Sequence, residues 1–307
     1  MTLGDGTVLE LFVDEAQLAA SVHAGKLGCT DCHWSISGYP HPPAEFPDRR
    51  SISLALYESC KRCHFLNYTR TLESVHFNML ARGHRDAPVC TDCHDAHAIT
   101  DPYQPRAAIS QRCARCHQSI HEAYVKSVHG QALVGEGNPD VPVCISCHRA
   151  HDIEDPRTAS FKLRTPELCG HCHGDKNLMQ KYGISTQVLR TYLSDFHGMT
   201  ASLLGEKTDL VSIPAVCTDC HGVHDIRAVE DPASPVMRAN LVKACRKCHP
   251  GASANFPAAW MSHYEPSPEK ARLVYYLNQF YRFFIPFVGF GLLLQVLLSL
   301  WRLAVNR

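Results

Sequence analysis

Cysteine and histidine recur along this sequence in one fixed spacing. All 16 cysteines fall into eight pairs separated by two residues, and a histidine directly follows the second cysteine of every pair. Two thiols about one helical turn apart can form thioethers with the two vinyl groups of a haem, and the next residue then lies beneath the ring, where its imidazole binds iron. The spacing predicts eight covalently attached haem c groups with these residues: Cys29, Cys32 and His33; Cys60, Cys63 and His64; Cys90, Cys93 and His94; Cys113, Cys116 and His117; Cys144, Cys147 and His148; Cys169, Cys172 and His173; Cys217, Cys220 and His221; Cys245, Cys248 and His249.

Disulfides and zinc sites are the two other common uses of paired cysteines. A disulfide framework gives no reason for a constant gap of two residues. A zinc site gives no reason for a histidine after the second cysteine in all eight motifs. The pattern therefore favours haem over both alternatives.

Twelve of the 20 histidines lie outside these motifs, and most of them are also patterned. Three histidines follow a motif histidine by three residues, namely His97, His151 and His224. A side chain so close in sequence stays on the proximal side of the haem attached to that motif. We therefore expect it to bind the iron of a neighbouring haem. Five more lie before, between or after the motifs in related short patterns, namely His23, His76, His129, His197 and His263. The number of these predicted distal ligands equals the number of irons.

A ninth candidate, His41, lies in a proline-containing loop after the first motif. It could replace the histidine missing three positions after His33, and His23 or His263 would then be surplus. His84, His121 and His171 fit no repeat, and we expect them to be solvated or hydrogen-bonded. The six methionines recur at no fixed position, so ligation by one histidine and one methionine is not expected as the rule.

Ligation by two histidines has a functional consequence. Such an iron has no open position for a substrate and suits one-electron transfer, at a comparatively low potential because no thioether ligand raises it. The sequence thus predicts an electron conductor. One alternative is a multihaem reductase or dehydrogenase of a small nitrogen or sulfur compound, which needs an iron without a distal ligand. Another is a module in which a surplus histidine binds a haem of a second subunit.

The motifs are organised as an internal repeat. Four two-haem units span about 20–68, 69–122, 123–190 and 191–255, and residues 87–102 align closely with residues 141–156. Proline and glycine should break the chain into short helices, which we expect near 11–24, 66–82, 118–134, 175–204 and 236–247. The sequence lacks the alternation typical of a sheet. The predicted fold is mainly α with extensive coil, in which four repeats stack around a chain of haems.

The C-terminal region reads as a membrane anchor. Residues 283–301 carry no charge, and 19 residues at about 1.5 Å each span roughly 28 Å, close to the hydrocarbon thickness of a bilayer. Aromatic residues lie at both ends of the segment, as interfacial residues do. We therefore expect a haem domain at 1–268, and an interfacial segment with one transmembrane helix at 269–307.

Covalent haem attachment takes place outside the cytoplasmic membrane. The expected location is therefore the outer face of a bacterial or archaeal cytoplasmic membrane, with the haem domain in the periplasm or its equivalent. Residues 1–11 lack the basic and apolar regions of a signal peptide, so a removed signal and an upstream start both remain open. The formal net charge of the whole chain is zero, and no basic block points to nucleic acid. Residues 1–268 hold 25 basic and 29 acidic residues, a mildly acidic balance.

These motifs resemble those of membrane-bound multihaem c-type cytochromes. The stretch from Ser262 to Pro286 also resembles the end of cytochrome subunits that associate with a membrane cytochrome b. The resemblance implies that electrons pass between the quinol pool and other redox proteins, through cytochrome b or another quinone-reactive subunit. Pro286, Gly289 and Gly291 favour close packing of the anchor against a partner helix.

Overall fold

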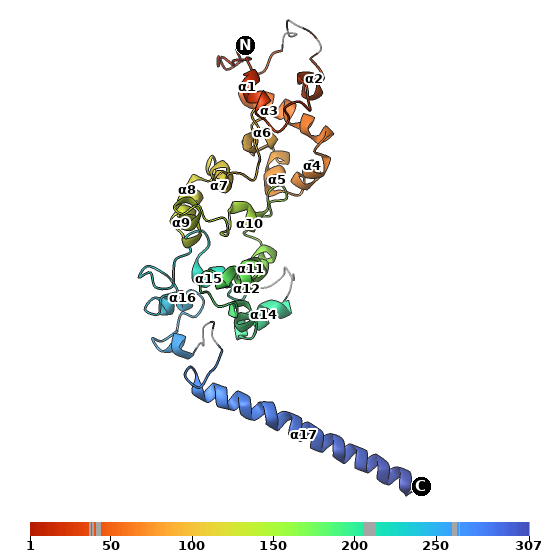
Figure 1. Ribbon diagram of the computed structural model, residues 1–307, viewed down its shortest axis with the longest axis vertical. Helices are drawn as coiled ribbons and strands as arrows, with labels where there is room; N and C mark the ends of the chain where they lie inside the picture. Colours follow the sequence, from red (N-terminus) through yellow and green to blue (C-terminus); the bar gives the residue numbers. More distant parts are fainter. Residues whose placement is uncertain are drawn as a thin grey trace. The chain divides into compact units, whose positions relative to one another are not determined.

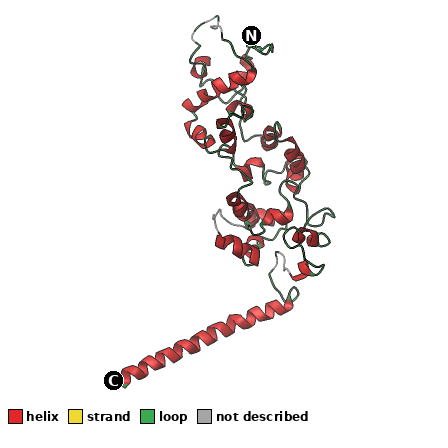
Figure 2. Cartoon of the chain, turned by 180° about the vertical axis from the view of Figure 1, so that it is seen from behind, coloured by secondary structure: helices red, strands yellow, loops and turns green. Residues whose placement is uncertain are grey.

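The protein is built from short helices joined by loops. The computed structural model describes residues 1–36, 38, 40, 44–204, 213–259, 263 and 265–306. Within these ranges no strand is formed, and Thr2 and Val8 make one isolated β-bridge (Figures 1 and 2). The α-helices are α1 (Glu15–Ala19), α2 (Cys29–Cys32), α3 (Arg49–Leu56), α4 (Phe65–Thr71), α5 (Val75–Ala81), α6 (Cys90–Cys93), α7 (Arg106–Ala114), α8 (Gln118–Val125), α9 (Val128–Val134), α10 (Cys144–His148), α11 (Ala159–His173), α12 (Lys176–Gln180), α13 (Val188–Leu193), α14 (Phe196–Leu204), α15 (Cys217–His221), α16 (Leu241–Arg246) and α17 (Arg272–Val305). Two 3₁₀ segments, η1 (Tyr57–Arg62) and η2 (Phe256–Ala259), complete the set.

Three of the expected helices are interrupted. The segment 66–82 forms α4 and α5, 118–134 forms α8 and α9, and 175–204 forms α12, α13 and α14. In each case a capping side chain starts a new helix, because its oxygen accepts a backbone N–H that the first helical turn leaves unpaired. Ser74 accepts from His76 N at 3.2 Å, Ser127 from Gly130 N at 3.1 Å and Asp195 from Gly198 N at 2.9 Å. The interruptions thus place His76, His129 and His197 in the first turn of a helix.

Four of the cysteine motifs begin helices of their own. In α2, α6, α10 and α15 the residue before the second cysteine reaches back to the N–H of the residue preceding the helix. These bonds measure 2.8 Å from Gly28 N to Asp31, 2.7 Å from Val89 N to Asp92, 3.1 Å from Val143 N to Ser146 and 2.8 Å from Val216 N to Asp219. The other four motifs lie at the C-terminal ends of η1, α7, α11 and α16. Four motifs are therefore held at the start of a helix, and the other four at the end of one.

Backbone hydrogen bonds join each predicted repeat to the next. The residue before an upstream histidine donates its N–H to a carbonyl that follows a Cys-x-x-Cys-His-x-x-His motif. The bonds are Val22 N to Ile99 O at 2.8 Å, Val75 N to Ile153 O at 2.8 Å and Val128 N to Ile226 O at 2.9 Å. The constant pattern supports the repeat seen in the sequence.

The chain forms two compact units. One contains Met1–Leu168 and Gly205–Asn240, and the other contains Cys169–Leu204 and Leu241–Arg307. In the described part of the first unit, Ile109, Tyr124, Leu133 and Val143 form a small apolar cluster between α7, α8, α9 and α10. In the second, α17 is 34 residues long, and it is the one described helix long and apolar enough to cross a membrane.

Candidate haem sites

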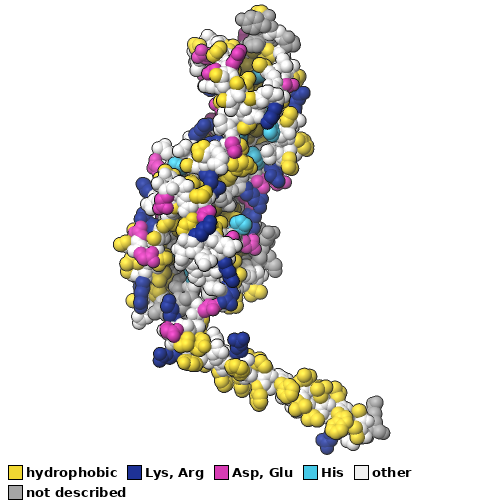
Figure 3. All heavy atoms as spheres, viewed as in Figure 1, with side chains coloured by type: hydrophobic (Ala, Val, Ile, Leu, Met, Phe, Trp, Pro, Cys, Tyr) yellow, Lys and Arg dark blue, Asp and Glu magenta, His cyan; other side chains and the backbone are white. Residues whose placement is uncertain are grey.

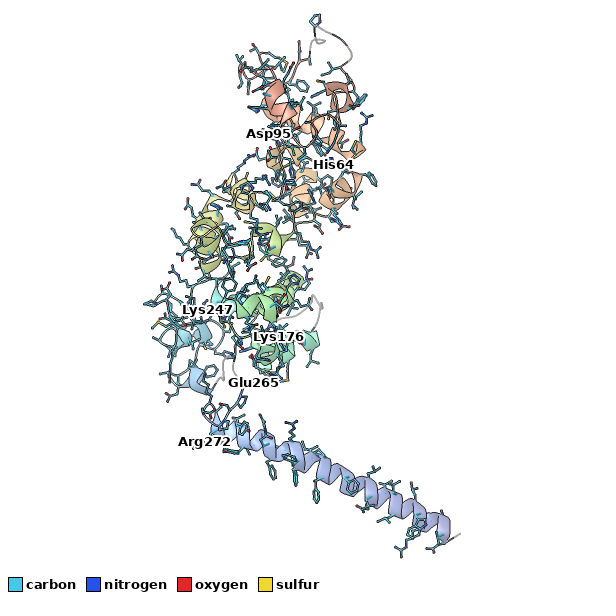
Figure 4. The ribbon with its side chains drawn as sticks, viewed as in Figure 1. His64, Asp95, Lys176, Lys247, Glu265 and Arg272 are labelled. Atoms are coloured by element: carbon cyan, nitrogen blue, oxygen red, sulfur yellow. The ribbon has the colours of Figure 1, made fainter. Side chains whose placement is uncertain are left out.

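Histidine side chains that are distant in the sequence meet in pairs. In each pair one ring belongs to a Cys-x-x-Cys-His motif and the other to the predicted distal set. Figure 4 labels one of these rings, His64, where η1 meets α4. The ring centroids are 6.0 Å apart for His33 and His97, 6.1 Å for His64 and His23, 6.2 Å for His94 and His151, 6.2 Å for His117 and His76, 6.0 Å for His148 and His224, and 6.3 Å for His249 and His197.

This spacing fits a metal ion between two imidazoles. A metal–nitrogen bond of about 2 Å on each side, with each ring centre roughly 1.2 Å beyond its nitrogen, separates the two centres by about 6.4 Å. The observed range of 6.0–6.3 Å is close to this value in all six pairs. The paired histidines therefore fit the two axial positions of a haem iron.

The backbone turns sharply after the motif histidine in two of the three Cys-x-x-Cys-His-x-x-His motifs. Arg149, directly after His148, has φ 61°, and Gly222, directly after His221, has φ 85°. Both values lie in the left-handed region, which glycine adopts without cost and other residues do not. The turn directs His151 away from its own motif, the fifth, and toward His94 of the third. His97 and His224 similarly face His33 and His148.

Burial favours the neutral form of these imidazoles. It lowers the pKa of His76, His94, His148, His151, His173, His224 and His263, and burial is the largest cause in each case. A nearby carboxylate opposes the shift in three of them, as Asp195 does for the pKa of His263. Neutral imidazole is the form that binds a metal. The surroundings of these seven imidazoles thus agree with ligation.

Neighbouring cysteine motifs lie close together within the first unit. A hydrogen bond between the thiols of Cys60 and Cys90 lowers the pKa of Cys60 and raises that of Cys90. An equivalent contact lowers the pKa of Cys144 and raises that of Cys113. These contacts place the second motif beside the third and the fourth beside the fifth.

Arginines link the remaining neighbours among the first four motifs. Arg62, inside the second motif, donates to the carbonyl of Asp31 in the first at 3.0 Å. Arg115, inside the fourth motif, donates to the carbonyl of Asp92 in the third at 2.8 Å. Together with the thiol contacts, these bonds arrange the first five motifs in chain order, each next to the one before.

Several supporting residues were not predicted from the sequence. Arg50 forms an ion pair with Asp92 at 2.7 Å and also donates to the carbonyl oxygens of Arg85 and Ala87. Lys162 pairs with Asp219 at 3.0 Å in the seventh motif. The recurrence of aspartate at the same position of three motifs indicates its capping role at a helix start, but it does not identify the cations that pair with it.

Aromatic rings support two of the motif histidines. Phe161 stacks on His148 with ring centres 5.5 Å apart and planes 5° apart. Phe256 lies 5.2 Å from His249 at 40°. Such contacts fix the orientation of a ligating ring, and no spacing rule in the sequence indicated them.

The remaining predicted ligands are placed as follows. His129 lies on α9, His173 on α11 and His221 on α15. His263 lies against α13, with its Nδ1 atom 3.5 Å from Thr191 Oγ1, and Glu265 two residues later forms an ion pair with Arg190 of the same helix (Figure 4). His41 lies outside the described residues.

Comparison with known protein families matches two blocks of the chain. A family described as the doubled CXXCH motif matches residues 82–122 and 133–178, each of which contains two of the cysteine motifs. The motifs are those of a multihaem c-type cytochrome. No curated protein and no solved structure matches the chain. Paired motifs of this kind indicate electron transfer through several haems, and the mainly helical fold agrees with that role.

Proposed function

We propose that the protein binds eight haem c groups, each attached through two cysteines and ligated by two histidines, and that it conducts electrons between a membrane module and other redox proteins. The observation that carries the proposal is the set of six histidine pairs with centroid spacings of 6.0–6.3 Å. The remaining motif histidines His173 and His221, with the distal candidates His129 and His263, complete the ligands for eight irons. In this assignment His41 is not needed.

The arrangement suits conduction better than catalysis. A haem iron with two imidazole ligands cycles between the ferric and ferrous states and so carries one electron at a time. Because each motif histidine in the six pairs already faces a second ring, the chain leaves no open side at these positions. The contacts among the first five motifs also keep these sites close enough to exchange electrons in chain order.

The proposed membrane module contacts the protein through its C-terminal helix. At about 1.5 Å per residue, the 34 residues of α17 span roughly 51 Å, which exceeds a hydrocarbon core of about 30 Å. The excess on the N-terminal side carries Tyr275, Tyr276 and Tyr281, which suit the headgroup region. We propose that this helix anchors the haem domain on the outer face of a bacterial or archaeal cytoplasmic membrane, beside cytochrome b or another quinone-reactive subunit.

Two measurements on the purified holoprotein test the proposal. Mass spectrometry should find eight haems linked through thioethers, and electron paramagnetic resonance of the oxidised protein should show only low-spin ferric iron. Fewer than eight haems would refute the stoichiometry. A stoichiometric high-spin iron that turns over a small nitrogen or sulfur compound would instead make the protein an enzyme.

A further inference from the structure

The acidic residues of the protein are concentrated at its N-terminal end. Residues 1–48 contain seven aspartates and glutamates and one lysine, whereas residues 49–268 contain 22 acidic and 24 basic residues. The first segment therefore has a formal charge of −6 and the much longer second segment a charge of +2. Haem propionates add negative charge at every site, so they do not produce this difference. The asymmetry is a property of the amino-acid sequence.

Most of these carboxylates face solvent and form no ion pair with a basic side chain. Asp48 forms an ion pair with Arg85 at 3.1 Å. The other six acids are exposed, and within the described residues no lysine or arginine forms an ion pair with any of them: Asp5, Glu10, Asp14, Glu15, Asp31 and Glu45. Unpaired charges of one sign on one surface produce a field that extends over a Debye length of about 8 Å at physiological ionic strength.

The backbone gathers these charges around the first haem motif. Gly4 N donates to Phe46 O at 2.9 Å and Asp5 N to Pro47 O at 2.8 Å, so the first residues fold back onto the segment that follows the motif. In Figure 1 the N-terminus, α1 and α2 lie at the same end of the first unit, and Figure 3 shows acidic and apolar side chains together there. We name residues 1–48 the acidic end.

The acidic end also exposes apolar residues and the edge of one haem site. Val8, Phe12 and Trp34 are 74%, 77% and 67% exposed, and Trp34 directly follows the motif histidine His33. The first motif is the only one of the eight in which both cysteines are exposed. Apolar side chains within a charged rim are typical of protein interfaces. An accessible thioether edge is where an electron can leave or enter the haem.

We propose that the acidic end docks a soluble redox protein whose own redox centre is surrounded by lysine or arginine side chains, and that the first haem exchanges electrons with it. This inference rests on the proposed function and names the kind of partner at one terminus of the conductor. Nucleic acid and anionic membrane surfaces carry the wrong charge. A second copy of the chain docked end to end would place two negative surfaces together, which costs energy.

The experiment compares two variants of the full chain, purified with its haems in detergent. The first replaces four acids of the acidic end: Asp5→Asn, Glu10→Gln, Glu15→Gln and Glu45→Gln. The matched control replaces four exposed acids of residues 49–268 and changes the total charge equally: Glu73→Gln, Glu136→Gln, Glu167→Gln and Glu230→Gln. Stopped-flow absorbance then follows electron transfer from each reduced protein to lysine-rich mitochondrial cytochrome c. The same acceptor with acetylated lysines is the second probe.

Electrostatic steering raises association rates by about 10 to 1,000 times at low salt. We therefore expect the acidic-end variant to react about tenfold more slowly than the wild type at low ionic strength, and the control to change less than twofold. The difference should disappear at high salt and with the acetylated acceptor. Equal rates for the two variants, or an acetylated acceptor that reacts as fast as the basic one, would overturn the docking proposal. So would dimers of the wild-type chain that dissociate in the acidic-end variant.

A neutral benzoquinone oxidant separates this proposal from the proposed function. Every variant that conducts electrons should reduce benzoquinone at the wild-type rate, because an uncharged molecule is not steered. If the wild-type protein fails to reduce benzoquinone, the proposed conduction fails. If it succeeds and the two variants do not differ with cytochrome c, only the acidic-end docking fails.

Discussion

Replacing His97 with alanine tests the assignment of ligands between motifs. His97 follows the third motif, yet its ring centre lies 6.0 Å from that of His33 in the first. His94, the motif histidine nearest to it in sequence, instead faces His151 at 6.2 Å. Alanine has no atom that can reach a bond length of about 2 Å to the iron. The variant should therefore lose one distal ligand, at the haem of the first motif, and keep all eight attachments.

The expected size of the effect follows from the stoichiometry. One iron in eight becomes high-spin, so one eighth of the low-spin ferric signal is lost, and the reduced protein binds one equivalent of carbon monoxide. The wild type should bind none. His121→Ala is the control, because His121 belongs to no pair described above, and it should also bind none.

A double variant tests whether His97 and His151 each ligate a separate iron. If His97 and His151 serve different haems, the combination of His97→Ala and His151→Ala should bind two equivalents of carbon monoxide. If one of the two histidines ligated no iron, the double variant would bind only one equivalent. That result, or the absence of any carbon monoxide binding by the single variant, would refute the reasoning from ring spacing.

Three further predictions concern the supports of the sites and the anchor. Gly130→Ala should disturb α9, because the new Cβ would collide with the backbone carbonyl of Tyr124 in α8. Thermal unfolding should show that the free energy of unfolding falls by about 1–3 kcal/mol. The control is Gly251→Ala, whose new Cβ meets nothing within 4 Å and should change stability little. Arg50→Ala should lower the free energy of unfolding by about 1–2 kcal/mol, since it leaves the partly buried Asp92 without its cation. Denaturant unfolding measures this change, and an unchanged midpoint would show that the ion pair is dispensable. Removal of residues 269–307 should release the haem domain from membranes and abolish co-purification of a b-haem subunit; retention of that subunit by the shortened chain would contradict the proposed contact.

The cysteine motifs were predictable because haem attachment is local chemistry. Two thiols and an imidazole must lie within five residues of one another, so their spacing is visible without any knowledge of the fold. The capping serines were visible for a similar reason. Ser74 and Ser127 precede Val-His in equivalent positions, although their effect, the division of one expected helix into two, depends on cap geometry that outweighs helix propensity.

The supporting contacts could not be predicted from spacing. Arg50 lies 42 residues from Asp92, and Phe161 reaches His148 from a different helix. Long charged side chains can bind at many places, and aromatic residues occur throughout the chain, so neither residue type identifies its partner. Only the path of the backbone between them does.

The sequence by itself determined the chemistry of this protein: the number of paired thiols, the proximal imidazole beside each pair and the supply of further histidines in a repeating pattern. The tertiary structure decided which histidine faces which. Left-handed turns at Arg149 and Gly222 direct His151 and His224 away from their own motifs, toward His94 and His148. The physical reason is that a covalent attachment constrains neighbouring residues, whereas axial ligation from the far side of a ring requires the chain to return from a distance.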